Sequence, residues 1–527
     1  MKNNIKLFFP LIVALALAGG YYMGLQLNKN SLITYGKSSS DLGAKFESIL
    51  EVIEERYVDT IDRDHFLDKA INDVLHKLDP HSNYIPSSEV ARMMESIDGK
   101  FGGIGVRFML HRDSLAITHV IPLSPSEKAD ILPGDRIIEV DGVELSTISL
   151  SNSWVMDHLK GEPGTKVAVK VFRNGKTSKH VITRGIIPLE SISCATMITP
   201  DVGYIRLEQF SQTSSDEFYS AATILKVKGM KKLIFDLRDN GGGVLGSAIE
   251  IIDEFLESGK LIVYTDGANQ PERRYTSSSR GILKDIEVAV LINENSASAS
   301  EIVAGAIQDN DRGMIIGRRS FGKGLVQEDI PLRDGSNIRL TVARYYTPTG
   351  RCIQRPYGEN VDYTEDFFHR YENGELYAVD STLFVDSLKY TTPGGRTVYG
   401  GGGIMPDIFV PYDSSHSSFY LSELRYGLAF GHFAFDKVNE WGRSKWKNED
   451  IYAKTFSVSD ALLNEFLTYA EKELGIDRDI TGEEKSKANL RKYLKAEIAR
   501  QIWVEQGYFR VIMESDPEAL KAIEVLH

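Results

Sequence analysis

The sequence predicts an α/β protein that carries an inserted β domain and has helical segments at both ends. Three observations lead to this prediction. Strand-like and helix-like segments alternate between residues 202 and 350, short strands with glycine turns fill residues 101–181, and apolar residues recur at helical spacing near both ends. Because 527 residues are too many for one hydrophobic core, two to four domains are expected.

Composition limits the classes of function to be considered. The chain is 42% hydrophobic and 26% charged, as ordinary globular proteins are. Its formal net charge of −13 disfavours nucleic-acid binding, which requires clustered Lys and Arg. Cys194 and Cys352 lack the CxxC spacing of a metal site, although a single disulfide between them remains possible.

The N-terminus has the pattern of an export signal or a membrane anchor. Lys2 and Lys6 precede an uncharged apolar stretch over residues 7–25, close to the roughly 20 residues that a helix needs to cross a bilayer. We predict a signal anchor or signal peptide over residues 1–29 and favour the uncleaved anchor. Because basic residues stay in the cytoplasm, the chain from about residue 30 should face the periplasm or the cell exterior.

Residues 30–98 are predicted to be helical, with helices over 45–57 and 65–78. The second helix ends at LDPHSNYIP, which contains two prolines. Residues 183–412 are the predicted α/β core, and residues 413–527 carry amphipathic runs that predict a helical appendage.

The predicted β domain, residues 99–182, begins with GGIGV. The N–H groups of Gly103, Ile104, Gly105 and Val106 surround a small apolar patch, and such a nest can bind a terminal carboxylate. LPGDRIIEVDG follows with a turn, a strand and an Asp-Gly turn. This pattern resembles a PDZ domain, so GGIGV is the predicted binding site for the C-terminus of a protein or peptide.

The segment NENSASASEIVAG, residues 293–305, places serines at a predicted strand-to-helix turn. Ser298 and Glu301 match the capping-box pattern, which predicts a helix cap. The same position also suits a nucleophile, because a helix N-terminus offers N–H groups and positive potential to an oxyanion. Position alone leaves both hypotheses open.

A serine nucleophile needs a neighbouring base, and no histidine lies between His180 and His369. Lys323 in SFGKGLVQ is the candidate, because burial can lower a lysine pKa from about 10.4 toward neutrality. Gln327 could hold the amine by a hydrogen bond. For an isolated GKG sequence, a surface lysine in a glycine turn is the simpler interpretation.

DLRDNGGG, residues 236–243, follows a predicted strand and offers successive glycine N–H groups for an oxyanion. A second interpretation is open, because Gly241, Gly243 and Gly246 match the dinucleotide fingerprint. Asp266, at the end of the next strand, lies near the place of a ribose-binding acid.

Together these elements resemble the C-terminal processing peptidases, also called tail-specific proteases. The resemblance runs from about residue 45 to 411 and also includes YYTPTGRCIQ and GGGGIMPDI. It implies a crotonase/ClpP-like core and a serine endopeptidase with a Ser/Lys dyad. In this dyad Ser298 is the nucleophile, Lys323 the base and Gln327 a supporting residue. Neither metal nor organic cofactor is implied.

The resemblance also implies accessory residues. The N–H groups of Ala299 and Gly242 would form the oxyanion hole, with Gly243 as the alternative to Gly242. Asp309 matches an acidic residue that is important in some members. Arg173 matches a PDZ arginine that in some members reaches toward the active site.

The resulting expectation is an envelope endopeptidase, anchored or exported on the periplasmic side of the inner membrane, that captures free, apolar C-termini of proteins or peptides. It has no nucleic-acid partner. Residues 355–400 and the helical tail depart from the family pattern, which leaves open the oligomeric state, including a homo-oligomer, and how substrates reach the site. Two alternatives stay open, a PDZ scaffold on an inactive core and a dinucleotide-dependent enzyme.

Overall fold

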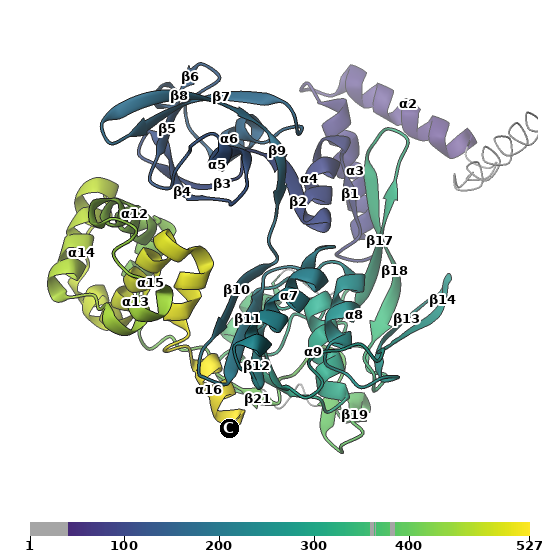
Figure 1. Cartoon of the computed structure of the whole chain (residues 1–527). Coiled ribbons are helices and arrows are strands. Elements are labelled where there is room, and N and C mark those ends of the chain that lie inside the picture. The colour runs from purple at the N-terminus through teal and green to yellow at the C-terminus, as the bar shows by residue number, and fades with distance from the viewer. Residues whose placement is uncertain (1–39, 359–362, 364, 380–384, 527) are drawn as a thin grey trace, which may run out of the picture. The chain divides into compact units, whose positions relative to one another are not determined.

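The computed structural model describes residues 40–358, 363, 365–379 and 385–526 (Figure 1). The predicted signal or anchor over residues 1–29 lies outside the described residues. Among those that are described, no helix combines the length and the apolar character needed to cross a bilayer. The described part of the chain divides between residues 71 and 72 into two compact units.

Helices were predicted near the N-terminus, and α2 (Ser40–Arg56) and α3 (Arg63–His76) confirm them. In the first unit, Arg63 forms ion pairs with Glu54 and Glu47. In the second unit, helix α4 (Ser87–Asp98) leads directly into the β domain. It lies within the predicted helical region 30–98, but the sequence analysis placed no separate helix at this position.

The β domain begins and ends with a two-stranded stem, in which β2 (Lys100–Gly103) pairs antiparallel with β9 (Gly185–Pro188). Its sheet has the order β3-β4-β5-β7-β8, with β6 beside β5, so β3 has a free outer edge within the described sheet. The strands are β3 (Val106–His111), β4 (Ser114–Val120), β5 (Arg136–Val140), β6 (Val143–Glu144), β7 (Lys166–Arg173) and β8 (Lys176–Thr183). Between them lie α5 (Pro125–Lys128), η1 (Leu145–Thr147) and α6 (Asn152–Leu159).

The α/β core is built on a six-stranded sheet of order β10-β11-β12-β15-β16-β21. Its first pair is antiparallel and the others are parallel. The strands are β10 (Ile192–Met197), β11 (Val202–Leu207), β12 (Lys232–Asp236), β15 (Glu287–Ile292), β16 (Met314–Gly317) and β21 (Ile408–Phe409). A second sheet joins β1 (Asn83–Ile85), β13 (Leu261–Gly267), β14 (Gln270–Thr276), β17 (Leu325–Pro331) and β18 (Asn337–Tyr346).

Both faces of the six-stranded sheet are covered, because side chains alternate along each strand. Leu233 and Phe235 of β12 pack in one apolar cluster with α7 (Ser214–Val227), α8 (Leu245–Asp253) and α9 (Ala299–Asp309). Ile234, between them, faces the other side and packs with helix α16 (Pro517–Val525). The last helix of the expected appendage therefore packs on the core sheet.

The other C-terminal helices, residues 419–512, form a cluster of their own that we call the tail domain. It contains α11 (Phe419–Tyr426), α12 (Ala429–Trp441), α13 (Glu449–Thr455), α14 (Asp460–Leu474) and α15 (Ile480–Ile512). The inserted segment contributes α10 (Asp366–Glu372), η3 (Asp386–Leu388), β19 (Lys389–Thr391) and β20 (Thr397–Tyr399). Cys194 and Cys352 are both free, so the possible disulfide is not formed.

Candidate active site

One cavity of the core, with a volume of ≈ 620 Å³, brings the residues of the predicted dyad and oxyanion hole together. Ser298, Ala299, Lys323, Gln327 and residues 241–245 all line it. They come from the start of α9, the loop before β17, β17 itself and the loop between β12 and α8. Helix α4 forms another part of the wall through Met93, Ser96 and Ile97.

Ser298 precedes the first residue of α9 in a backbone conformation that differs from that of an ordinary cap. Its φ is 53° and its ψ is −111°. Ser151, Ser418 and Ser459 cap other helices with an extended backbone, and each side chain accepts an N–H three residues later. A non-glycine residue with positive φ costs about 1–3 kcal/mol, and such strain clusters at functional sites. Capping alone therefore does not account for Ser298.

Glu301 connects the segment of Ser298 to the segment of Lys323. One carboxylate oxygen, Oε2, accepts the N–H of Ser298 at 2.9 Å and the N–H of Lys323 at 2.8 Å. The other, Oε1, accepts the Ser320 hydroxyl at 2.5 Å and the N–H of Gly322 at 2.6 Å. Complete burial raises the pKa of Glu301 to about 7. The capping-box pattern indicated the bond to Ser298, but not the bonds to the lysine loop.

Lys323 has the environment that a neutral amine needs. Its Nζ donates to Gln327 Oε1 at 2.8 Å. Burial is the largest effect on this amine and lowers its pKa, and the charge of Arg339 lowers it further, against Asp79 and Glu301. The lysine is therefore more easily deprotonated than one in water, which is the property that a general base requires.

A loop far away in the sequence holds Gln327. The Gln327 Nε2 donates to the carbonyl of His81 at 2.6 Å, so its Oε1 faces the lysine. Asp79 fixes this loop by accepting the N–H groups of His81 and Ser82, each at 2.8 Å, and the Ser82 hydroxyl at 2.6 Å. Residues 78–84 lie within the stretch that resembles the family, but the sequence analysis assigned none of them a role.

Two further groups complete this region. The hydroxyl of Tyr345, which is buried, lies 2.8 Å from the carbonyl oxygen of Lys323 and 3.2 Å from that of Ser298. His81 Nε2 lies 2.8 Å from the Tyr363 hydroxyl. Burial, together with the charge of Lys323, lowers the pKa of His81 to about 4, so this imidazole is neutral at pH 7. The resemblance included YYTPTGRCIQ, which begins at Tyr345, but it implied no role for this tyrosine, and no motif pointed to Tyr363.

The glycine loop approaches Ser298 as closely as its lack of a side chain allows. A Cβ on Gly242, whose φ is +99°, would lie 2.7 Å from the Ala297 carbonyl oxygen and 2.8 Å from the Ser298 Cβ. The Gly242 N–H, however, donates to Asn240 Oδ1 at 2.9 Å. Among the hydrogen bonds of the described residues, the N–H groups of Ala299 and Gly243 have no acceptor. Gly243, the predicted alternative, is thus the freer donor.

The structure does not bring Asp309 or Arg173 into the cavity. Asp309 pairs with Arg351 at 2.6 Å, and both side chains are fully buried. Its Oδ2 accepts the N–H and the hydroxyl of Thr349, at 3.1 and 2.7 Å, so it fixes the turn after β18. Arg173 stays within the β domain, where its Nε and Nη2 donate to Asp135 at 2.6 and 2.8 Å.

The predicted carboxylate-binding loop has its carbonyl groups turned into the β domain. The carbonyls of Ile104 and Gly105 accept N–H groups of Ser126 and Ile121 at 2.9 and 3.0 Å. In the described part of the chain, the N–H groups of Ile104 and Gly105 have no acceptor. Gly105 has a φ of +81°, and a Cβ there would lie 2.3 Å from the Ser124 Cβ. The loop therefore presents donors, as a carboxylate site does.

The order of the strands contradicts the dinucleotide-binding interpretation. The neighbours of β12 are β11 and β15, whereas Asp266 lies on β13 and pairs with Arg344 in the other sheet. The ribose-binding acid of a dinucleotide site belongs on the neighbouring parallel strand. Among the described residues, no three His, Cys, Asp or Glu side chains are grouped to hold a metal ion.

Known proteins are similar in sequence to most of this chain. The family described as peptidase family S41 matches residues 201–364, a PDZ domain matches residues 102–183, and a family of unknown function, DUF8443, matches residues 420–504. A carboxy-terminal-processing protease of Bartonella bacilliformis is 36% identical over 378 residues, which cover 70% of this chain and 84% of that protein. The carboxy-terminal processing protease CtpA of Bacillus subtilis is 33% identical over 361 residues, covering 67% of this chain and 76% of that protein.

Among solved structures, the photosystem II D1 C-terminal processing protease aligns with 71% of this chain and 94% of its own, at 24% identity and a TM-score of 0.36. The PDZ match lies on the β domain, and the family of unknown function lies within the tail domain.

Proposed function

The chain belongs to peptidase family S41, the carboxy-terminal-processing serine proteases, and from this premise we propose that it is an endopeptidase with a Ser298/Lys323 dyad. One observation carries the proposal. The strained Ser298 lines the same cavity as Lys323, whose pKa is lowered by burial and whose amine is held by Gln327.

In the proposed reaction, the neutral Lys323 amine takes the proton of the Ser298 hydroxyl as Oγ attacks the scissile carbonyl carbon. The oxyanion receives hydrogen bonds from Ala299 N–H and from Gly243 or Gly242 N–H. The lysine ammonium then gives its proton to the leaving amine. Water, activated by the same lysine, hydrolyses the acyl-enzyme. Gln327 orients the amine throughout.

The PDZ domain is proposed to bind the free C-terminus of a protein or peptide with apolar last residues. The donor loop of Ile104 and Gly105 and the free edge of β3 support this role. For the core we propose the crotonase/ClpP-like spiral, supported by a mainly parallel sheet with both faces covered. Residues 1–29 support a location on the periplasmic side of the inner membrane, anchored or exported.

The test is cleavage of an unstructured protein with an apolar free C-terminus by residues 30–527. Wild type should cleave it, and Ser298→Ala and Lys323→Ala should both lose activity while staying folded. Ser459→Ala removes an ordinary cap from α14, so it should lower the free energy of unfolding by about 0.5–2 kcal/mol and keep the activity. No cleavage by wild type, together with binding of the free C-terminus, would favour the alternative of a PDZ scaffold on an inactive core.

A further inference from the structure

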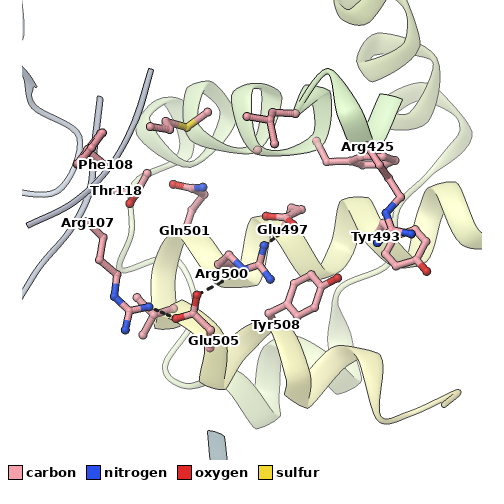
Figure 2. Close-up of a pocket in the computed structure, with 15 residues that line it drawn as sticks. Arg107, Phe108, Thr118, Arg425, Tyr493, Glu497, Arg500, Gln501, Glu505 and Tyr508 are labelled. Atoms are coloured by element: carbon pink, nitrogen blue, oxygen red, sulfur yellow. Dashed lines mark hydrogen bonds and ion pairs between the residues drawn. The ribbon is translucent and has the colours of Figure 1, made fainter. Parts of the chain in front are cut away.

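A second cavity, of ≈ 530 Å³, lies between the PDZ domain and the tail domain (Figure 2). Its PDZ wall consists of Arg107, Phe108 and Met109 of β3 with Thr118 of β4. Its tail wall includes Arg425, Tyr493, Glu497, Arg500, Gln501 and Tyr508. The PDZ side of the cavity is thus formed by the strand that directly follows the carboxylate-binding loop.

Strand β3 is the edge strand on which a PDZ domain adds its peptide. Its side chains alternate between two faces. Phe108 packs against the apolar core of the domain, whereas Arg107 forms an ion pair with Glu505 of the tail domain. Because Phe108 lines the cavity together with its two neighbours, the cavity reaches the edge of the strand. An added peptide strand would therefore border this cavity.

The position of the terminal carboxylate determines which side chains of the peptide enter the cavity. With the carboxylate at Ile104 and Gly105, the last residue lies beside Val106 and shares its face with Phe108. Opposed residues of antiparallel strands place their side chains on the same face. The penultimate side chain then points to the other face, the one of Arg107, and into the cavity.

The tail wall selects the chemistry of that side chain. Gln501 is 5% exposed, and its Oε1 has no hydrogen-bond partner among the described residues. In Figure 2 its amide points away from α15 into the space beside Thr118. An unpaired acceptor disfavours a carboxylate as its partner. Counting both walls, three arginines and two glutamates line the cavity, and this balance disfavours a cation. A neutral amide side chain satisfies both conditions, because it donates and accepts.

We propose that the tail domain completes the peptide site of the PDZ domain and selects a penultimate Gln or Asn in the bound C-terminus. The inference rests on the proposed capture of C-termini, but not on the Ser/Lys dyad. It gives the segment matched by a family of unknown function a role in substrate selection.

The experiment measures binding of labelled peptides with a free carboxylate to the full chain carrying Ser298→Ala, which leaves the peptide uncut. The peptides share an apolar last residue and differ only in the penultimate one, which is Gln, Ala, Glu or Lys. The Gln peptide should bind about three- to tenfold more tightly than the other three, the effect of one net hydrogen bond.

Adding Gln501→Leu should abolish the preference for Gln over Ala and keep the affinity for the Ala peptide. Thr118→Val is a second variant on the opposite wall and should weaken the same preference. Asn464→Leu changes an exposed amide of α14 outside this cavity and should leave the preference intact.

The proposal is wrong if wild type shows no preference for Gln, or if the preference survives in both Gln501→Leu and Thr118→Val. An equal loss of affinity for every peptide in Gln501→Leu, with the preference unchanged, would show a purely structural residue and also contradict it. A peptide with an amidated C-terminus distinguishes failure of the proposed C-terminus capture from failure of the penultimate-residue selection. Equal binding of amidated and free peptides would contradict capture of the carboxylate itself.

Discussion

The geometry of the proposed dyad depends on single residues that touch neither Ser298 Oγ nor Lys323 Nζ in any described hydrogen bond. Glu301 holds both main-chain segments with one buried carboxylate. Asp79 holds the loop whose carbonyl orients Gln327. Both are positioning residues, and each has a distinct pH signature.

Replacing Glu301 with Gln should remove a pH-dependent cost of stability. Its pKa rises from 4.5 to about 7 on folding, so between these pH values the folded protein binds more protons than the unfolded chain. Wild-type stability therefore loses about 3 kcal/mol from this group as pH rises through that window. Urea unfolding at pH 5 and 7.5 should show a smaller decline in Glu301→Gln. The exposed Glu257→Gln should behave as wild type, and an unchanged decline in Glu301→Gln would contradict the assignment.

Asp79→Asn should move the ascending limb of the kcat/KM profile to lower pH. The negative charge of Asp79 favours the protonated form of Lys323, so its removal lowers the lysine pKa further. Loosening of the Gln327 amide has the same sign and should also lower kcat. Asp334 provides a matched control, because it accepts the N–H and the hydroxyl of Ser336 in the same way, but no described hydrogen bond joins its turn to Gln327. A limb that stays in place in Asp79→Asn would contradict this role.

The sequence predicted the residues that lie on short motifs and missed those that meet through folding. Ser298, Lys323, Gln327 and the glycine loop were all predicted, and they line one cavity. The hydrogen bond from Gln327 to the His81 carbonyl joins residues 246 positions apart, and no local pattern reveals such a pairing. Nor does a motif show that the Gly242 N–H is already bound by Asn240.

At the scale of elements, the site lies at the carboxyl ends of parallel strands β12 and β15, where the loops of the sheet converge. Alternation and glycine turns predicted these strands and helices well. Helix α4 was missed because its segment, SSEVARMMESID, has no buried residue and lies between two prominent motifs. The contribution of Met93, Ser96 and Ile97 to the cavity wall could be recognised only in the folded structure.

Gly242→Ala should abolish cleavage while the chain still folds. A methyl group there would collide with the Ala297 carbonyl and with Ser298, and it would also strain a backbone of φ +99°. Alanine keeps the N–H group, but the displaced loop would move the neighbouring Gly243 N–H away from the proposed oxyanion position. Misplacing one oxyanion donor costs about 10²–10³ in kcat, so at least that loss is expected. Gly241→Ala is the control, because a Cβ at that position meets nothing within 4 Å. Comparable activity of the two variants in the cleavage assay would contradict the predicted close approach.

At the scale of the whole molecule, the PDZ domain can be removed at a defined point. Gly103 and Gly185 are paired across the β2-β9 stem, so an Asn-Gly turn can replace residues 104–184. The shortened chain should cleave unstructured proteins equally whether their C-terminus is free or amidated, whereas the complete chain should prefer the free one. An unchanged preference after excision would show that the PDZ domain does not recognise the free C-terminus.

Helix α4 has one more consequence, which concerns the size of the released product. Ile97, on the wall of the cavity that contains Ser298, and Gly103, at the start of the predicted carboxylate-binding loop, are joined by six peptide links, which span at most about 20 Å. A bound substrate can run between these points with about six extended residues. The first fragment cut from a bound C-terminus should therefore have a short and nearly constant length, because the backbone between the two sites limits the distance between them.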